Sequence, residues 1–219
     1  MTRASRQDAP GGHGTGPAAL AVAPPSPWVT RFAPLIDRAA GPVLDVACGR
    51  GRHARWLVER GYAVVGVDID PSGAADLAGR ALILRADLER PAATGTRERA
   101  DNDAPGWPFA EGRFAGVIVT NYLWRPLFDR LIGALAPGGI LIYETFAQGN
   151  ERLGRPATPA HLLAPGELLD RVAGRLGVIA YEHGEVALPR PAVVQRIAAA
   201  APAVRGGDPA AEPPRALPP

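Results

Sequence analysis

A glycine-containing loop between a short apolar run and an amphipathic segment constrains the fold of this chain more than any other feature. The apolar run covers residues 43–46, the loop reads GRGRHA from Gly49 to Ala54, and the amphipathic segment ends before Gly61. In open α/β sheets, such a loop joins a buried strand to a helix whose N-terminus faces a ligand. The sequence therefore predicts an α/β fold with a ligand site at the carboxyl end of its first strand.

The same alternation continues along the chain. Further apolar runs, each the length of one buried strand, lie at 63–67, 81–86, 114–120 and 140–143. A helix is expected to begin at Pro27, with Ser26 as its N-cap, and to end at Gly41-Pro42. Further helical segments are expected at 53–60, 74–79, 127–135 and 167–176. Two last β-like runs, 177–183 and 192–198, are joined by a link too short for a crossover helix, so they should pair antiparallel. We therefore predict a Rossmann-like, doubly wound α/β fold with a mainly parallel seven-stranded sheet and a C-terminal antiparallel strand pair.

The domain organisation follows from length and local composition. A chain of 219 residues, 47% of them apolar, has the size of one domain, which we place at 26–200. Residues 1–25 and 201–219 are rich in Gly, Pro and Ala, so we expect two disordered tails. We expect a surface loop at 91–106. The aperiodic segment 146–165 is either a lid over the site or an ordinary surface loop.

The composition removes several classes of function. All 24 basic residues are arginine, which excludes a Walker-type phosphate loop, a pyridoxal Schiff base and a Tyr/Lys dehydrogenase pair. The net charge of +2 is spread along the chain and does not imply nucleic acid.

The lone cysteine, Cys48, fits a reducing compartment, and no Cys/His group has zinc spacing, so we expect no metal site. No apolar run approaches the roughly 20 residues that span a bilayer, so we expect a soluble cytoplasmic protein. The sequence does not indicate the oligomeric state.

Two aspartates decide which ligand the loop holds. GRGRHA satisfies G-x-G-x-x-A, and Asp68 ends the next apolar run at about the twenty-residue distance that suits ribose hydroxyls, which permits NAD or FAD. Asp45, however, ends the first strand beside the loop, where its charge would repel a pyrophosphate. The α-ammonium group of S-adenosylmethionine would instead be stabilised there. The alternative is that Asp45 only caps loop amides.

The run Asp45-x-Ala47-x-Gly49-x-Gly51 resembles the D/E-x-G-x-G-x-G motif of class I S-adenosylmethionine-dependent methyltransferases. Ala47 replaces the first glycine, and we expect it to fit with an ordinary φ. The similarity covers about residues 28–200. Within the class, the chain is most similar to small bacterial enzymes of the tellurite and thiopurine types, although no motif assigns either substrate.

The resemblance implies a set of cofactor-binding residues. By position in the motifs, Asp68 would bind the ribose, Ile69 would lie beside adenine and Asp87 near its amino group. From their position at the start of the helix, Arg52 and His53 either lie near the cofactor's carboxylate or are solvated. The full predicted cofactor set is Asp45, Ala47, Cys48, Gly49, Gly51, Asp68, Ile69, Asp87, Leu88 and Asn121. Cys48 is interpreted as a small residue in a tight turn rather than a nucleophile.

Candidates for the acceptor side follow the fourth and fifth strands. Glu144 is the predicted base, in case the acceptor must lose a proton. Tyr122 and Trp124 are candidates for the acceptor wall, and Tyr122 is also placed in the catalytic set. Arg125 is predicted either to pair with an anionic acceptor or to be solvated or bonded to Glu144 or Glu151. Asn121 either contacts the cofactor's amino group, positions the acceptor or serves as a helix N-cap.

The predicted function is that of an S-adenosylmethionine-dependent methyltransferase (EC 2.1.1.-) acting on a small-molecule or unidentified acceptor. Two alternatives stay open: a non-catalytic module that binds S-adenosylmethionine, and an NAD(P)-dependent oxidoreductase. RNA also stays open as an acceptor. The sequence after the fourth apolar run, Thr120 to Leu123, is not Asn-Pro-Pro-aromatic, which argues against methylation of adenine or glutamine amino groups.

Overall fold

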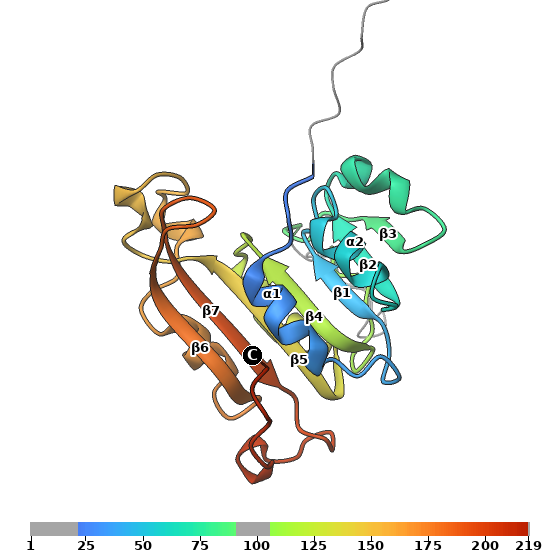
Figure 1. The fold of residues 1–219 in the computed structure, drawn as a ribbon. Coiled ribbons are helices and arrows are strands. Elements are labelled where there is room, and N and C mark those ends of the chain that lie inside the picture. Colours follow the sequence, from blue (N-terminus) through green and yellow to red (C-terminus); the bar gives the residue numbers. More distant parts are fainter. Residues whose placement is uncertain (1–21, 91–105, 219) are drawn as a thin grey trace, which may run out of the picture.

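One seven-stranded sheet forms the centre of the protein. The computed structural model describes residues 22–90 and 106–218, and the predictions made for 1–21, 91–105 and 219 lie outside these residues. The strands are β1 (Val43–Val46), β2 (Val64–Asp68), β3 (Leu82–Arg85), β4 (Phe114–Thr120), β5 (Leu135–Phe146), β6 (Gly177–Val186) and β7 (Ala192–Ala200). They lie in the order β3-β2-β1-β4-β5-β7-β6 (Figure 1).

The direction of the strands agrees with the predicted sheet. β3, β2, β1, β4 and β5 pair parallel. β7 pairs antiparallel with both β5 and β6. The sheet is therefore mixed, mainly parallel, and the expected C-terminal antiparallel pair is confirmed. Because β1 sits between β2 and β4, the loops that leave β1 and β4 diverge here, which is where open α/β sheets bind their ligands.

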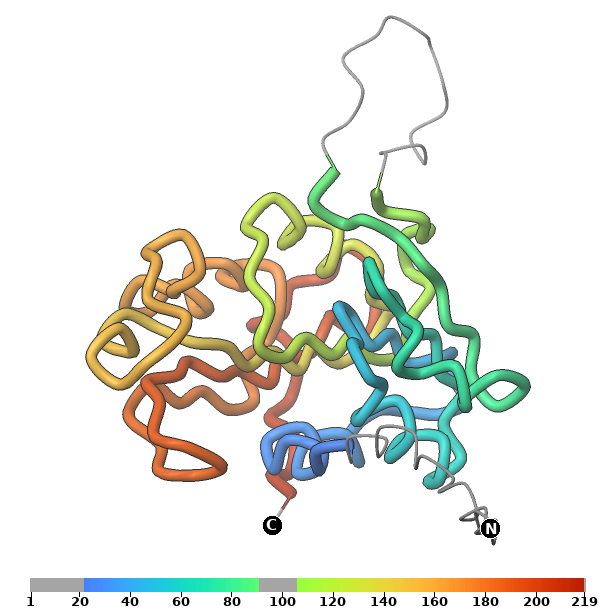
Figure 2. The backbone as a smooth tube through the Cα atoms, turned by 90° about the horizontal axis from the view of Figure 1, so that it is seen from above, coloured from blue at the N-terminus to red at the C-terminus, as the bar shows by residue number. Residues whose placement is uncertain are grey.

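Helices cover both faces of the sheet. The α-helices are α1 (Pro27–Phe32), α2 (Arg52–Val58), α3 (Phe128–Gly133) and α4 (Glu167–Val172). Short 3₁₀ helices are η1 (Ala33–Leu35), η2 (Pro71–Leu77), η3 (Arg125–Leu127), η4 (Asn150–Arg152), η5 (Pro159–His161) and η6 (Pro209–Ala211). Apolar residues of α1, α2 and η2 pack on one face of the sheet, and those of α3 and α4 on the other (Figure 2). Both faces of the central strands are thus buried, which explains their nearly continuous apolar sequences.

The first helix begins where its sequence predicts. The Ser26 side chain accepts a hydrogen bond from the Trp28 N–H at 3.1 Å, and Pro27 occupies the first helical position. The indole Nε1 of Trp28 donates to the Ile197 carbonyl on β7 at 3.2 Å. These contacts fix the start of α1 and hold the helix against the sheet.

The fifth strand differs from its prediction. It begins at Leu135 rather than at residue 140, so the Pro-Gly-Gly sequence lies inside the strand instead of stopping the chain before it. A Cβ atom at Gly139 would lie only 2.8 Å from the Ala136 carbonyl oxygen and 3.0 Å from that of Phe114. The register against β4 shifts between Phe114 and Gly116. The glycines therefore allow a close backbone approach at a bulge.

The C-terminal segment also differs from its prediction, because residues 201–218 pack on the domain rather than forming a disordered tail. The Gly138 N–H donates to the Pro202 carbonyl at 2.9 Å, and the Arg31 Nε donates to the Pro218 carbonyl at 3.3 Å. Proline and alanine side chains lose little entropy when they become ordered, so a few such contacts can hold the segment. In residues 22–90 and 106–218, no helix is long and apolar enough to cross a membrane.

Candidate functional site

Three left-handed backbone positions shape the loop between β1 and α2. Ala47 has φ +50°, Gly49 +52° and Gly51 +72°. The expectation of an ordinary φ at Ala47 is therefore wrong. An alanine in this region carries a steric cost that glycine avoids, on the order of 1 kcal/mol. The turn from β1 into α2 thus requires the glycine-like conformation even where the sequence has no glycine.

The two glycines of the loop have different environments. A Cβ atom at Gly51 would lie 3.0 Å from the Leu77 Cδ1 atom and 3.1 Å from the Ala74 Cβ atom, so Gly51 lets the loop pack directly on η2. A Cβ atom at Gly49 would meet nothing within 4 Å. The loop is therefore packed against protein at Gly51 and open at Gly49, as expected if the open side receives a ligand.

The carboxylate of Asp68 holds the loop against the end of β2. Its Oδ2 atom accepts the Gly49 N–H at 2.7 Å, and its Oδ1 atom accepts the Asp70 N–H at 2.9 Å. Each oxygen has a second lone pair, so the carboxylate can still accept hydrogen bonds from hydroxyl groups of a ligand.

Asp45 lies beneath the loop rather than at its surface. Its side chain is 1% exposed, and its Oδ2 atom accepts the Ala54 N–H in the first turn of α2 at 3.1 Å. Burial raises the pKa of Asp45 to about 7, although the Ala54 N–H and the charge of Arg52 lower it. The contact that the structure contains is therefore the alternative interpretation, a cap on a loop amide, and Asp45 lines neither of the clefts described below.

His53 joins the loop to the segment before α1. Its Nε2 atom accepts the Ser26 N–H at 3.1 Å, so the ring proton of the neutral form is on Nδ1, which lies 3.8 Å from the Asp45 Oδ1 atom. Burial, assisted by the charge of Arg52, lowers the pKa of His53 to about 3. The His53–Asp45 pair is consequently not an ion pair at neutral pH, and His53 positions the N-terminal segment.

Cys48 is buried behind the loop. Burial, reinforced by the charges of Asp45 and Asp68, raises the pKa of its thiol to about 12. A Cβ atom at Gly66 of β2 would lie 3.1 Å from the Cys48 Sγ atom. The thiol thus stays protonated in a confined space, in line with its interpretation as a small packing residue.

A first cleft of about 540 Å³ opens beside Asp68. It is lined by Ala47, Asp68, Ile69, Ala86, Asp87, Leu88, Glu89, Arg90 and Tyr122. Ile69 is 61% exposed, an unusual position for a large apolar side chain. The Tyr122 hydroxyl is buried near the Glu89 carboxylate, but it makes no hydrogen bond of ordinary geometry among the described residues. Such a hydroxyl is a donor that a bound ligand could satisfy.

This first cleft brings together five residues of the predicted cofactor set, Ala47, Asp68, Ile69, Asp87 and Leu88. It also contains Tyr122, which the sequence placed on the acceptor side. Burial raises the pKa of Tyr122, so the phenol stays protonated. The position of Tyr122 suits a contact with the cofactor better than a base.

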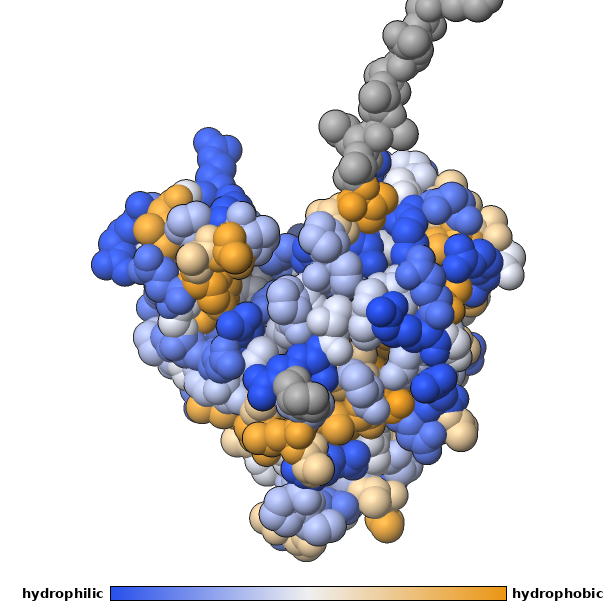
Figure 3. Space-filling model, in the orientation of Figure 1, coloured by the Kyte–Doolittle hydropathy of each residue, from blue (hydrophilic) through white to orange (hydrophobic). Residues whose placement is uncertain are grey.

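A second cleft of about 620 Å³ lies on the other side of the loop. Its walls come from residues 23–27, Arg52, the ends of β4 and β5, the β6–β7 loop and β7. The space-filling view shows the surface hollowed between the lobe that carries the β6–β7 hairpin and the lobe that carries α2 and β3 (Figure 3). Asn121 lines the second cleft and Tyr122 the first, so the two clefts adjoin.

Asn121 and Glu144 lie where the two clefts adjoin. Asn121 has φ +55° and donates its backbone N–H to the Glu144 carbonyl at 2.9 Å, so it turns the chain after β4 and is not a helix N-cap. The Glu144 carboxylate faces the second cleft. Its Oε1 atom accepts the Ser26 hydroxyl at 2.9 Å, and its Oε2 atom lies 3.3 Å from the Arg196 Nη1 atom.

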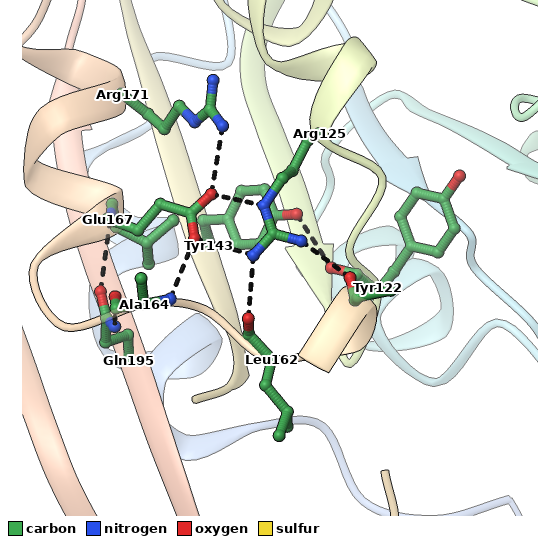
Figure 4. Close-up of polar contacts among 10 residues, drawn as sticks. Tyr122, Arg125, Tyr143, Leu162, Ala164, Glu167, Arg171 and Gln195 are labelled. Carbon is green, nitrogen blue, oxygen red and sulfur yellow. Dashed lines mark hydrogen bonds and ion pairs between the residues drawn. The ribbon is translucent and has the colours of Figure 1, made fainter. Parts of the chain in front are cut away.

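Arg125 lies away from both clefts and is bonded to neither Glu144 nor Glu151. Its Nε and Nη2 atoms donate to the two carboxylate oxygens of Glu167 at 2.8 and 2.9 Å, and its other contacts are carbonyl oxygens of residues 160 and 162 (Figure 4). Burial raises the pKa of Glu167, but hydrogen bonds from Arg125, the Ala164 N–H and Arg171 outweigh it and leave that pKa below its usual value. Arg125 therefore fastens α4 and the preceding chain to η3.

Contacts within the segment 146–165 and with β7 restrain this segment, which the sequence predicted as either a lid or a surface loop. Asn150 is 2% exposed, donates its amide to the Pro156 carbonyl at 2.9 Å, and accepts the Val193 N–H at 3.2 Å. Ala147 and Leu163 form an isolated bridge. In this structure, the segment is thus attached to β7 and packed on the domain.

Sequence reasoning missed Ser26, Arg190 and Arg196, which all line the second cleft. The Gln195–Arg196 pair inside the otherwise apolar β7 sequence was the available signal for Arg196. Arg190 belongs to a loop and carries no periodicity that could have identified it. In the described residues, no group of three or more His, Cys, Asp or Glu side chains could hold a metal ion.

Comparisons with known proteins identify the family of this chain. The model of a family described as a methyltransferase domain matches residues 21–175. The chain is 31% identical over 133 residues to a trans-aconitate 2-methyltransferase of Sinorhizobium fredii, a match that covers 58% of this chain but only 44% of that protein.

Solved structures share the fold at low sequence identity. A methyltransferase structure from Methanosarcina mazei has a TM-score of 0.58 and 16% identity, covering 82% of this chain and 99% of that one. The 1,6-didemethyltoxoflavin-N1-methyltransferase of Burkholderia thailandensis, solved with 1,6-didemethyltoxoflavin and S-adenosylhomocysteine, has a TM-score of 0.54 and 20% identity. That match covers 80% of this chain and 78% of the Burkholderia chain.

The strain at Ala47 predicts that Ala47→Gly stabilises the protein. Glycine removes the steric strain of the left-handed φ in the folded protein, but it also adds conformational entropy to the unfolded chain. The relief of strain should be the larger effect, for a net stabilisation of about 0.5–1 kcal/mol. The thermal midpoint should then rise by about 1–4 °C in scanning calorimetry. Ala78→Gly is the control, because Ala78 is exposed with φ −52° and should lose stability. An unchanged or lower midpoint for Ala47→Gly would show that position 47 is unstrained.

The buried carboxyl of Asp45 predicts a pH-dependent stability difference from Asp45→Asn, which keeps an oxygen for the Ala54 N–H. Below about pH 4, Asp45 is protonated in both the folded and the unfolded chain. Between pH 4 and 7, the unfolded chain releases this proton while the folded chain keeps it. The free energy of unfolding of the wild type therefore falls relative to that of the variant, by up to roughly 4 kcal/mol. Above pH 7, the difference between the two proteins stays constant. Urea unfolding at several pH values measures this difference, and parallel curves for the two proteins would contradict it.

Proposed function

This chain belongs to the methyltransferase domain family, whose model matches residues 21–175. From that premise, we propose that it transfers the methyl group of S-adenosylmethionine to a small-molecule acceptor bound in the second cleft. The observation that carries this proposal is the adjacency of two clefts at the carboxyl ends of β1, β2, β4 and β5, one beside Asp68 and one beside Glu144.

The first cleft fits the adenosine part of the cofactor. Asp68 has lone pairs for two ribose hydroxyls, and the exposed Ile69 and the neighbouring Leu88 offer apolar surface for the adenine ring. The Tyr122 hydroxyl supplies a donor, and the open side of Gly49 leaves room for the ligand to approach the backbone. When bound, S-adenosylmethionine supplies a methyl group activated by positive sulfur.

Arg52 is the proposed partner of the cofactor's carboxylate. It is the first residue of α2, lines the second cleft, and its Nη2 atom donates to the Thr120 hydroxyl at 3.3 Å. Its charge adds to the positive N-terminal end of the helix. Asp45 is a positioning residue in this proposal, because it ties the first turn of α2 to β1 from below.

The acceptor is proposed to be small for two reasons. The second cleft, at about 620 Å³, has the size of pockets that hold small molecules. The relative from Sinorhizobium fredii is named for trans-aconitate, and the Burkholderia structure contains 1,6-didemethyltoxoflavin. The protein's contribution to the reaction would be alignment of the acceptor and exclusion of water, because the methyl group arrives already activated.

Two other functions make different predictions. A non-catalytic module would bind S-adenosylmethionine but release no methylated product. An NAD(P)-dependent oxidoreductase would bind nicotinamide cofactors, and its sheet would continue with parallel strands where this one has the antiparallel β7. Incubation with labelled methyl donor and a fractionated cell extract distinguishes them, and labelled RNA in that assay would identify a nucleic-acid acceptor instead.

Substitution of Asp68 tests the cofactor site. Asp68→Asn keeps an acceptor for one backbone amide but loses the charged acceptor for the ribose hydroxyls, so we expect the Kd for S-adenosylhomocysteine to rise about 10- to 100-fold. Isothermal calorimetry measures this Kd. Asp70→Asn is the matched control, because Asp70 makes the same kind of bond to the amide two residues ahead, at 3.2 Å, and lines neither cleft. Equal affinities for Asp68→Asn and wild type would refute the assignment.

A further inference from the structure

We propose that the acceptor is an organic acid with an apolar body, and that its own carboxylate oxygen receives the methyl group to give a methyl ester. This inference rests on the proposed function and specifies its substrate class. It follows from three properties of the second cleft as its described residues form it: two arginines without an ion pair, an apolar wall and no free base.

Three arginines, Arg52, Arg190 and Arg196, line the second cleft, against a single carboxylate, Glu144. The positive charge of Arg196 is compensated by two carboxylates. Its Nη1 atom lies 3.3 Å from Glu144, and its Nη2 atom lies 2.7 Å from Glu182 on the neighbouring strand. This arrangement fixes Arg196 across three strands, β5, β7 and β6. Its charge is therefore already matched inside the protein.

Arg52 and Arg190 are different. Within the part of the chain that the structure describes, neither forms an ion pair with a carboxylate. Arg190 donates from Nη2 to the Arg155 carbonyl at 3.0 Å and lies 5.4 Å from the centre of the Phe146 ring. Two cations in one cleft suit two anionic groups. The cofactor's carboxylate accounts for Arg52, and Arg190 is then available for an anion on the acceptor.

The surroundings of Arg190 are apolar. Phe146, Val186, Leu188 and Val194 line the same cleft, and Leu188 is 83% exposed. Hydrophobic surface is visible on the lobe that carries the β6–β7 hairpin (Figure 3). Exposed apolar side chains beside a cleft favour a ligand with an apolar body. An inorganic anion or a sugar would make no favourable contact with these apolar side chains.

The cleft also lacks a free base. Among the residues that the structure describes, its lining contains no His, Cys or Tyr side chain and one carboxylate, that of Glu144. Both oxygens of Glu144 are engaged, by Ser26 and Arg196. An alcohol or a protonated amine would need to lose a proton. A carboxylate does not, because it is already ionised at neutral pH.

The reaction balances without proton transfer. A lone pair on the acceptor's carboxylate oxygen forms the new bond to the methyl carbon, and the carbon–sulfur bond breaks with its electron pair left on sulfur. The products are a methyl ester and S-adenosylhomocysteine. Arg190 would hold the acid through one oxygen and leave the other free to attack, and the loss of the acid's charge on esterification would weaken that contact and favour product release.

A panel of matched ligands tests the inference. The probes are trans-cinnamate, phenylacetate, octanoate and trans-aconitate, each beside the corresponding amide, which has nearly the same shape without the charge. Saturation-transfer NMR and calorimetry on the protein saturated with S-adenosylhomocysteine should show acids of the panel binding at least about 10-fold more tightly than their amides. With labelled S-adenosylmethionine, mild alkali should release the transferred label as methanol, which identifies an ester.

Arg190→Gln should weaken the binding of the acids about 10-fold and leave the binding of the amides unchanged. Arg38→Gln is the matched control. Arg38 also donates to a carbonyl, that of Arg60 at 3.1 Å, and lies 5.2 Å from the centre of an aromatic ring, that of Tyr62, but it precedes β1, at the amino end of that strand, and lines neither cleft. The control should bind acids as the wild type does.

Amides that bind as tightly as acids, label that alkali does not release, or an Arg190→Gln variant with unchanged preference for acids would each overturn the inference. A protein that binds S-adenosylhomocysteine but no acid of the panel also contradicts it, and the proposed function then stands. Absence of S-adenosylhomocysteine binding in the first titration would instead refute the proposed function.

Discussion

The left-handed loop between β1 and α2 is the constraint on which the rest of the site depends. Its three positive φ angles, at Ala47, Gly49 and Gly51, turn the chain from the sheet into a helix. Two carboxylates hold it, Asp45 from beneath through the Ala54 N–H and Asp68 from the side through the Gly49 N–H. The protein tolerates a buried acid and a strained alanine here, which is the pattern expected of a site that must keep one shape.

That loop also explains why the two clefts have different chemistry. On the side of β2, Asp68 and apolar side chains offer hydrogen-bond acceptors and a surface for a flat ring. On the side of β4 and β5, the described lining is arginine-rich and apolar, and its one carboxylate, that of Glu144, is engaged within the protein. A neutral nucleoside suits the first environment and anionic groups suit the second, so a ligand with both parts would lie across the loop.

Local sequence patterns predicted what depends on local periodicity and missed what depends on distant contacts. The apolar runs located all seven strands, and the short link after β6 predicted its antiparallel pairing, because both follow from residues close in sequence. The left-handed φ of Ala47, the Arg125–Glu167 pairing and the packing of residues 201–218 depend on partners far along the chain. Asp45 illustrates the limit most clearly, because the sequence placed it at the end of β1 beside the loop, while the direction of its side chain needed the structure.

A crystal structure of the complex with S-adenosylhomocysteine tests the central claim most directly. The account predicts ribose hydroxyls on the Asp68 carboxylate, the adenine ring against Ile69 and Leu88, the amino-acid carboxylate toward Arg52, and the second cleft still open beside the ligand sulfur. A ligand bound elsewhere, or one that fills the second cleft and leaves Asp68 without a contact, would contradict it.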